Sequence, residues 1–284
     1  MKIGVIIQAR TSSKRLPGKV LMPLPFGSGI SVLQQVVRRL KRSKKINEII
    51  IATTVNRGDT SIVNLARKEG VLFFRGSKQN VLERYYLCAK KNKLDVIVRI
   101  TSDSPCIEGK LVDDAVAKHL STGADYSSNT LKNGFPRGLD VEVINFSALE
   151  KAFYNAKNLF EREHVTAYIY RTKPSLFKIT KIEAPRKLRA LGIRITLDTK
   201  QDYALLCAIF EYLYPRNQYF NVSDIVKLFK NKPWLKLING SVQQKNVHIT
   251  LRSELKEALN ILKSRGLERT RDFLNENLIK DQRC

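Results

Sequence analysis

The chain has 284 residues, of which 43% are hydrophobic and 27% are charged, and its formal net charge at pH 7 is +25. This length suits one large α/β domain, or such a domain with a small appendage, and the composition is ordinary for a soluble globular protein. No stretch approaches the ~20 apolar residues of a membrane helix, and Gln8 and Arg10 interrupt the first apolar run too early for a signal peptide.

Strand and helix patterns alternate through the first part of the chain. Ser31 is the expected N-cap of the first helix, and Gly70 is expected to end the second. Repeated strand–helix units imply a mostly parallel sheet with helices on both faces, an α/β fold of the Rossmann-like kind. The expected strands are 3–7, 49–54, 71–74 and 95–101, and the expected helices are 32–40, 59–69 and 81–91.

The alternation loosens after residue 105, and the pattern changes again at 241. In the middle we expect helices at 110–120, 147–156, 161–171, 200–214 and 222–230, and strands at 139–144, 177–183 and 193–196. The tail predicts a short strand at 247–251 and two helices, 253–264 and 268–278. We therefore expect a main domain over 1–240 and a small, largely helical appendage over 241–284 that packs on this domain or across a dimer.

A small, hydroxylated and basic loop follows the first strand. Arg10, Lys14, Arg15 and Lys19 lie close together in it and would repel one another unless water or a polyanion lies between them. A Pro–Gly pair fixes a turn just before Lys19. Because α/β sheets present such loops to phosphates at their carboxyl edge, the segment predicts a phosphate site. On charge alone, a solvated basic loop would be favoured over a phosphate site.

Two aspartates that follow short apolar strands are candidate metal ligands. Asp103 comes directly after the strand at 95–101, and Asp198 follows the strand at 193–196. Magnesium bound with a nucleotide uses one or two carboxylates together with phosphate oxygens. Either aspartate is equally suited to cap the next helix, so the residues alone leave both roles open. We interpret Asp202 as a first-turn helix charge.

The basic loop resembles the signature I-x-A-R-x-x-S-x-R-L-P-x-K of the SpsF-type sugar-nucleotide cytidylyltransferases, nearly continuously from Ile6 to Lys19. Later segments resemble further motifs of this family in the same order. They are R-G-S-x-x-x-V-L-x-R at 75–84, T-S-D-S-P at 101–105, P-R-G-x-D-x-E at 136–142, E-R-E-H-V-T at 161–166 and T-x-D-T at 196–199. In the second of these, Ser102 and Ser104 replace a glycine and a cysteine. The resemblance covers residues 3–240 and implies the nucleotidyltransferase fold.

The resemblance also implies a role for each matched position. Lys19 and Arg10 would bind the phosphates of CTP, Asp103 would bind Mg²⁺, and these three would carry catalysis. Asp198 would be the second metal ligand. The other implied nucleotide-binding residues are Gln8, Ala9, Ser13, Arg15, Thr53, Arg75, Gly76, Ser77 and Arg84. The implied acceptor-binding residues are Arg137, Asp140, Glu142 and His164. A guanidinium at 137 suits an acidic or phosphorylated acceptor.

The implied reaction is transfer of CMP from CTP to a sugar-like, acidic acceptor in polysaccharide or glycoconjugate precursor synthesis, with release of pyrophosphate. The four cysteines show neither pairing nor metal-ligand spacing, so we expect a reducing cytoplasm as the compartment. We also expect a homodimer. One alternative is a nucleotide-binding relative without turnover. Another is a nucleic-acid-binding protein that uses the tail, which is less favoured because Lys and Arg are spread over the whole chain without interleaved aromatics.

Overall fold

The computed structural model describes residues 1–131, 134–190, 192–242 and 251–281. The chain divides into two compact units, Met1–Ser241 and Val242–Cys284. The second unit contains α10 (Leu251–Ser264) and α11 (Glu268–Asp281), and Gly266 between them has a φ of +66°. Both helices expected in the tail are thus confirmed. The strand expected at 247–251 lies outside the described residues, apart from Leu251, which begins α10.

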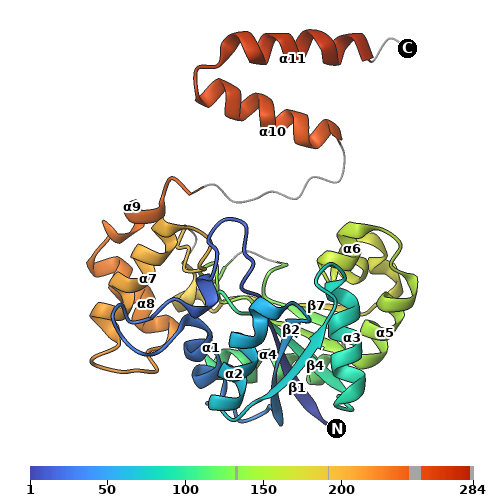
Figure 1. Cartoon of the computed structure of the whole chain (residues 1–284), viewed down its shortest axis with the longest axis vertical. Coiled ribbons are helices and arrows are strands. Elements are labelled where there is room, and N and C mark those ends of the chain that lie inside the picture. The colour runs from blue at the N-terminus through green and yellow to red at the C-terminus, as the bar shows by residue number, and fades with distance from the viewer. Residues whose placement is uncertain (132–133, 191, 243–250, 282–284) are drawn as a thin grey trace. The chain divides into compact units, whose positions relative to one another are not determined.

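A sheet of seven strands runs through the described part of the first unit (Figure 1). The order is β3-β2-β1-β4-β6-β5-β7, in which β6 is antiparallel to both of its neighbours and all other pairs are parallel. The mostly parallel α/β sheet expected from the sequence is confirmed. The strands are β1 (Ile3–Gln8), β2 (Glu48–Thr54), β3 (Leu72–Gly76), β4 (Val96–Thr101), β5 (Tyr126–Ser128), β6 (Glu142–Asn145) and β7 (Ile179–Lys181).

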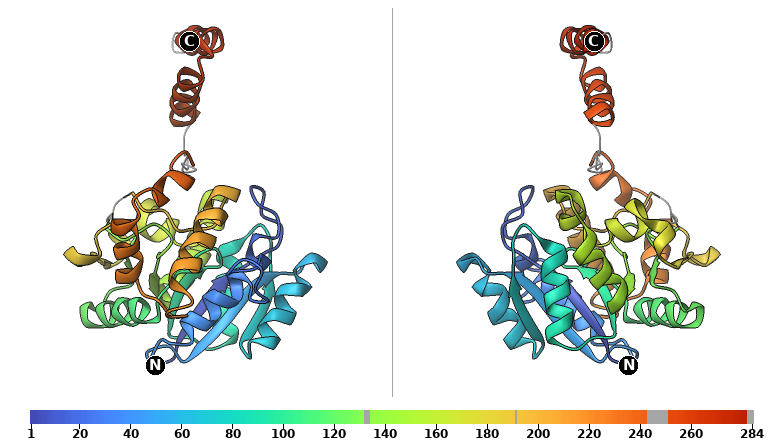
Figure 2. Two further views of the ribbon diagram at one scale, coloured as in Figure 1. Left: turned by 90° about the vertical axis from the view of Figure 1, so that its left-hand side faces the viewer. Right: turned by 90° about the vertical axis from the view of Figure 1, so that its right-hand side faces the viewer.

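Helices cover both faces of the sheet (Figures 1 and 2). Alternate residues of β1 point to opposite faces, so Val5 and Ile7 enter one apolar cluster and Ile6 enters the other. The first cluster includes side chains of α1, α2, α4, α7 and α8, and the second includes those of α3 and α5. The helices are α1 (Val32–Leu40), α2 (Thr60–Lys68), α3 (Val81–Lys91), α4 (Gly109–Thr122), α5 (Phe146–Asn155), α6 (Leu159–Glu163), α7 (Lys200–Leu213), α8 (Val222–Asn231) and α9 (Leu235–Asn239).

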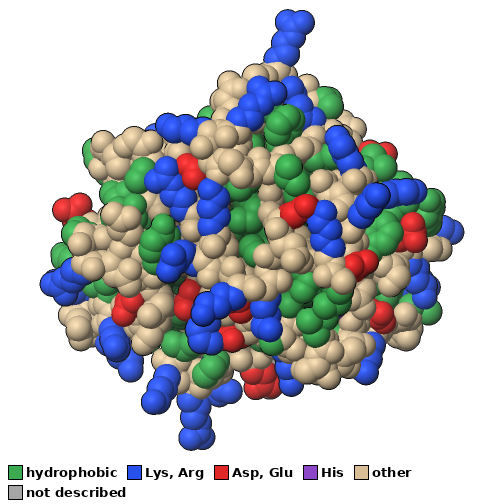
Figure 3. All heavy atoms as spheres, turned by 90° about the horizontal axis from the view of Figure 1, so that it is seen from below, with side chains coloured by type: hydrophobic (Ala, Val, Ile, Leu, Met, Phe, Trp, Pro, Cys, Tyr) green, Lys and Arg blue, Asp and Glu red, His purple; other side chains and the backbone are tan. Residues whose placement is uncertain are grey.

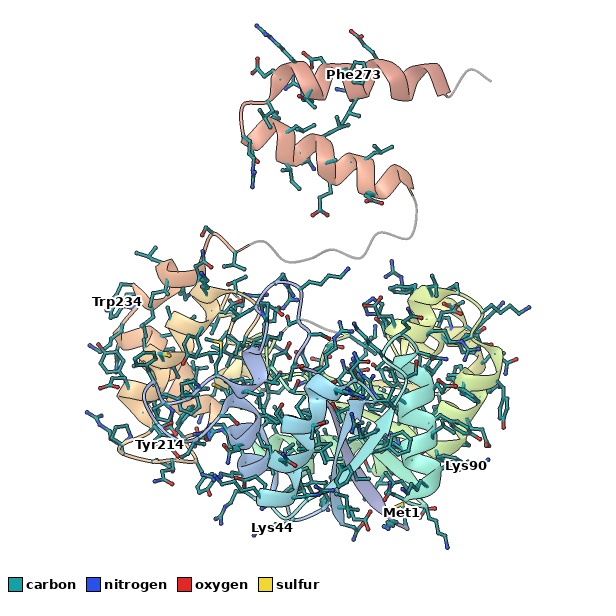
Figure 4. All side chains as sticks on the ribbon, in the orientation of Figure 1. Met1, Lys44, Lys90, Tyr214, Trp234 and Phe273 are labelled. Atoms are coloured by element: carbon teal, nitrogen blue, oxygen red, sulfur yellow. The ribbon has the colours of Figure 1, made fainter. Side chains whose placement is uncertain are left out.

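Strand direction brings distant segments to one edge of the sheet. Gln8 of β1 lies level with Thr101 of β4, and Thr54 of β2 lies level with Gly76 of β3. The loops after these four parallel strands therefore leave the sheet at its carboxyl edge. Since β6 is antiparallel, it starts at this edge, where Glu142 pairs with Arg99. Met1 and Lys44 lie at the opposite edge (Figure 4).

Two expectations in the middle of the chain are wrong, and a third is right only in part. The helix expected at 161–171 is broken at Val165, whose φ is +50°, so that α6 stops at Glu163 and a separate π-helical turn follows at Tyr168–Thr172. The segment 193–196 forms no strand and makes only an isolated bridge between Arg137 and Arg194. The strand expected at 177–183 shortens to β7, and β5 beside it was not expected.

Charge is distributed over the surface rather than concentrated in one patch on the face that Figure 3 shows. Lys and Arg side chains are scattered there among Asp and Glu. This matches the spread of basic residues along the sequence. Among the described helices, none is both long enough and apolar enough to cross a membrane.

Candidate active site

Lys19 lies between two carboxylates at the carboxyl edge of the sheet. Its backbone follows Gly18, whose φ of +71° provides the turn that directs the lysine inward. The Lys19 ammonium donates hydrogen bonds to Asp103 Oδ2 at 2.6 Å and to Asp198 Oδ1 at 2.9 Å. It also donates to the carbonyl oxygen of Leu197 at 2.6 Å. Three segments that lie far apart in the sequence thus meet at one nitrogen atom.

Asp198 is the most heavily paired carboxylate of the site. Besides Lys19, it binds Arg15 Nη2 at 2.7 Å through Oδ1 and Arg194 Nη2 at 2.8 Å through Oδ2. Burial by itself would raise the pKa of Asp198, but the neighbouring cations, Lys19 above all, outweigh burial and hold its pKa below the ordinary value. The side chain is therefore ionised at neutral pH and faces three positive charges.

Asp202 holds this arrangement in place from the first turn of α7. Its side chain is 0% exposed and accepts hydrogen bonds from Arg194 Nε at 2.9 Å and from the backbone N–H groups of Asp198 and Thr199, both at 3.0 Å. Asn239 of α9 donates to it at 2.9 Å. The first-turn position expected for Asp202 is confirmed. Its role in orienting Arg194, and the contact with Asn239, had no signal in the sequence.

The loop after β4 is joined to the segment before α7 by backbone contacts. The carbonyl oxygen of Asp103 accepts a hydrogen bond from the Leu197 N–H at 2.9 Å. Ser104, where the family motif has cysteine, pairs its hydroxyl with that of Thr101 at 3.1 Å. The serine is thus accommodated within the loop, and Asp103 keeps its place beside Lys19.

Gly138 brings the segment implied to bind the acceptor against the same region. Its φ is +104°, and a Cβ there would come within 2.6 Å of the Thr196 nitrogen. Arg137 pairs through its backbone with residues on either side of Arg194, since its N–H donates to Ile193 and its carbonyl accepts from Ile195. Only glycine therefore fits the close approach that draws 137–138 to the site.

Asp59, which the sequence analysis missed, anchors the basic loop. This buried carboxylate accepts hydrogen bonds from both the backbone N–H and the hydroxyl of Thr11, at 2.8 and 2.7 Å, and from the hydroxyl of Thr54. Burial would raise its pKa, but the hydrogen bonds from Thr54 and Thr11 outweigh burial and lower it. Asp59 thus ties the start of the loop to the end of β2. It lies in none of the short motifs that resemble the family.

If the loop binds CTP, as the motif resemblance implies, Asp59→Asn is expected to raise the KM for CTP, because Arg10 and the loop that follows it lose their anchor. Hydrogen bonds to a charged group contribute about 1.5–3 kcal/mol, so an increase of about tenfold is expected. Steady-state kinetics with Ser61→Ala as the exposed neighbouring control would measure it. An unchanged KM in a folded Asp59→Asn protein would show that the loop does not depend on this carboxylate.

Several of the implied nucleotide-binding residues make contacts within the protein. Arg75 donates to the carbonyl oxygens of Thr54 at 3.0 Å and Asn56 at 2.7 Å. Arg84 is buried and donates to the carbonyl of Ser77, and burial lowers its pKa. These two arginines therefore brace the loops after β2 and β3.

The remaining nucleotide-side residues differ in accessibility. Arg10 is half-buried and makes no hydrogen bond or ion pair within the part of the chain that the structure describes, so its guanidinium is available. Gln8 accepts a hydrogen bond from Arg99 at 3.3 Å, whereas Thr53 is fully buried. Gly76 packs closely on Arg84. Ala9 is buried, and Ser13 is half-buried within the loop.

Among the implied acceptor residues, Glu142 belongs to a buried hydrogen-bond network. Glu142 accepts hydrogen bonds from Arg99, from the hydroxyl of Tyr126 at 2.7 Å and from the hydroxyl of Thr166 at 2.7 Å. The family-like element at 161–166 therefore reaches the site through Thr166. His164 instead follows the end of α6 and packs on Phe160, with ring centroids 4.6 Å apart.

Arg137 and Asp140, two further implied acceptor residues, are both half-buried. Arg137 Nη1 is buried and has no hydrogen-bond partner among the described residues. Burial raises the pKa of Asp140, and the nearby carboxylates of Glu142 and Asp103 raise it further, against the opposing effect of Arg137. A buried guanidinium nitrogen without a partner is costly, so this position suits an anionic group of a ligand.

The oxygens around Lys19 fit a divalent cation bound together with a nucleotide. Two carboxylate oxygens and one carbonyl oxygen converge on a single positive charge, and oxygen ligands of this kind are those that Mg²⁺ prefers. Among the described residues, no group of three or more His, Cys, Asp or Glu side chains is arranged to hold a metal alone. Two carboxylates completed by phosphate oxygens would therefore be the donor set.

Comparison with known proteins gives matches that span most of the chain. A family model described as cytidylyltransferase matches residues 4–259. An uncharacterized protein of Methanocaldococcus jannaschii is 44% identical over 246 residues, which make up 87% of this chain and 98% of that protein. The spore coat polysaccharide biosynthesis protein SpsF of Bacillus subtilis is 35% identical over 230 residues, or 80% of this chain and 94% of that protein.

A solved structure agrees with these sequence matches. A cytidylyltransferase from Leptospira borgpetersenii superposes with a TM-score of 0.77 at 31% identity, covering 87% of this chain and 99% of that one. Each of these three proteins aligns over nearly its whole length with less than nine-tenths of this chain, so this chain is longer than each of them.

Proposed function

The chain belongs to the cytidylyltransferase family, and from this premise we propose that it transfers CMP from CTP to a sugar-like, acidic acceptor and releases pyrophosphate. The observation that carries the proposal is the position of Lys19 between Asp103 and Asp198, next to a basic loop at the carboxyl edge of the sheet. Polyphosphates bind at such edges in open α/β folds. The name of the relative from Bacillus subtilis supports a place in polysaccharide synthesis.

The basic loop would bind the triphosphate. Arg10 has a guanidinium without partners among the described residues, and Arg15 is partly exposed while it pairs with Asp198. Lys19 would add a third positive charge beside the α-phosphate. The nucleoside would be surrounded by the loops that Arg75 and Arg84 brace, together with Gln8, Ala9 and Ser13. Gly76 and Ser77 would contact it from the end of β3, and Thr53 would lie behind them.

The chemical step would be an in-line displacement at the α-phosphorus. The acceptor hydroxyl oxygen forms a bond to this phosphorus, the bond to the bridging oxygen of the β-phosphate breaks, and pyrophosphate leaves with the electron pair while the hydroxyl proton passes to solvent. The chain needs no covalent nucleophile for this step. Its residues would act by positioning both substrates and by neutralising negative charge as it develops.

Asp103 and Asp198 would hold Mg²⁺ when CTP is bound. The ion supplies charge neutralisation on the phosphate oxygens and helps to orient the triphosphate. Asp198 is held in place by Arg194, and Asp103 by the backbone contact with Leu197, so both carboxylates are oriented before the substrates bind.

On the acceptor side, we expect Arg137→Ala to raise the KM for an acidic acceptor by about 10- to 100-fold, because a hydrogen-bonded charge contributes about 1.5–3 kcal/mol. The KM for CTP is expected to change much less. Arg137→Lys, which keeps the charge but loses the bidentate geometry, is expected to recover part of the loss. Equal changes in both KM values would place Arg137 outside the acceptor site.

Calorimetry with the four nucleoside triphosphates in the presence of Mg²⁺ tests the substrate class without knowledge of the acceptor. The proposal requires CTP to bind more tightly than ATP, GTP and UTP. If no nucleotide binds, the proposed function is wrong.

The compartment and the oligomeric state are also part of the proposal. Three cysteines are free thiols, which supports a reducing compartment such as the cytoplasm as the place of the reaction; they are Cys88, Cys106 and Cys207. A homodimer remains a prediction.

A further inference from the structure

The hydrogen-bonding capacity of the Lys19 ammonium is fully used within the protein. An ammonium has three N–H donors. Those of Lys19 are directed to Asp103 Oδ2, Asp198 Oδ1 and the Leu197 carbonyl, all between 2.6 and 2.9 Å. The side chain is only 11% exposed. Without a ligand, Lys19 therefore neutralises the carboxylates and cannot at the same time extend to a phosphate.

The two carboxylates differ in how much they depend on Lys19. Asp198 retains ion pairs with Arg15 and Arg194 if Lys19 moves away. Asp103 has Lys19 as its ion-pair partner, and no second cation pairs with it among the described residues. Its side chain is 22% exposed, so it is open to an incoming ion. The departure of Lys19 would thus uncover one accessible carboxylate and leave the other still positioned.

We propose that Lys19 and a divalent cation are alternative occupants of the Asp103–Asp198 pair. The inference rests on the proposed function, since it is the triphosphate that would give the lysine another partner. A divalent ion and an ammonium cannot share these oxygens, because two positive charges at such short distances repel each other strongly. The long, flexible stem of lysine allows its charge to move between partners without a change in the fold.

Two consequences follow for binding. The nucleotide-free protein binds divalent ions weakly, because the ion must displace an internal ammonium. Once the phosphates of the nucleotide draw Lys19 away, the same carboxylates accept the ion, so nucleotide and metal bind with positive coupling. The lysine thereby prevents metal from occupying the site before the substrate arrives.

Mn²⁺ binding to the nucleotide-free protein, followed by electron paramagnetic resonance of free Mn²⁺, tests the proposal. We expect Lys19→Met to bind Mn²⁺ at least about tenfold more tightly than wild type. The substitution removes the positive charge that competes with the ion for the two carboxylates, and one neighbouring charge typically changes an affinity by about this factor. Lys14→Met removes the same charge from an exposed position in the same loop and is the matched control. It is expected to leave the affinity unchanged, and Asp103→Asn in the Lys19→Met background is expected to remove the gain.

A gain in Lys19→Met no larger than in Lys14→Met would overturn the proposal, as would tight Mn²⁺ binding to the wild type. Lys19→Gln keeps N–H donors for the carboxylates and serves as a second variant if Lys19→Met does not fold; it must show a gain in the same direction. Because these measurements contain no nucleotide, their failure is distinguishable from failure of the proposed function. CTP turnover without the Mn²⁺ gain would contradict this inference alone.

Discussion

Asp103→Asn is expected to lower kcat for CTP-dependent transfer by about 10²–10³, the usual cost of removing one electrostatic partner of a transition state. Asparagine keeps the size of the side chain but loses the charge that would hold a metal ion and that now pairs with Lys19. The backbone carbonyl of residue 103, which binds the Leu197 N–H, is not altered. Circular dichroism should therefore show an intact fold.

Asp114→Asn is the matched control for this variant. Asp114 is an exposed residue of α4 that pairs with Lys110. Its removal is expected to leave kcat within the error of the measurement. If Asp103→Asn were folded and as active as Asp114→Asn, Asp103 would have no part in the reaction.

Asp202→Ala is expected to lower the free energy of unfolding by about 3–5 kcal/mol, the range for removal of one partner of a buried ion pair. The substitution leaves Arg194 Nε without its acceptor, although Arg194 keeps its ion pair with Asp198. It also leaves Asn239 and two backbone N–H groups without the carboxylate that accepts their hydrogen bonds. Chemical denaturation would measure the loss. The milder Asp202→Asn is expected to fall between Asp202→Ala and wild type, and an exposed control, Asp114→Asn, to match wild type.

The same carboxylate predicts a pH dependence of stability. Burial would raise the pKa of Asp202, but Arg194 and Asn239 outweigh burial and hold it below the ordinary value of 3.8. Its contribution is therefore complete above the ordinary pKa and is lost as the pH falls through the lower native pKa. In acid the difference between wild type and Asp202→Ala should shrink. A constant difference from neutral pH into acid would mean that the ion pair is not its source.

The sequence predicted the first half of the fold well because local signals and tertiary structure agree there. Ser31 caps α1 and accepts a hydrogen bond from the Gln34 N–H, as the polar residue before the apolar stripe indicated. The α3 bounds coincide with those expected. The later errors arise where tertiary contacts override local pattern. Val165 interrupts a helical pattern. The segment 193–196 alternates apolar and polar residues like a strand but packs against Gly138 instead of joining the sheet.

The candidate site was visible in part through motifs. Lys19 follows a recognisable turn and Asp103 a recognisable strand, and parallel strand direction predicts that the two share an edge. Asp198 was found through its motif and through an expected strand at 193–196 that does not form. The Lys19 contacts themselves were not predictable, since they depend on the packing of segments that lie 84 and 179 residues apart in the sequence. Asp59 was overlooked because an aspartate before a helix is so common a capping residue that it carries no particular signal.

Pyrophosphate release, measured with each of the four nucleoside triphosphates, Mg²⁺ and a panel of acidic sugars, tests the central claim most directly. The account predicts release that requires both CTP and one of the acceptors and that falls by about 10²–10³ in Asp103→Asn. Release at the wild-type rate in that variant, or release that does not depend on CTP, would contradict it.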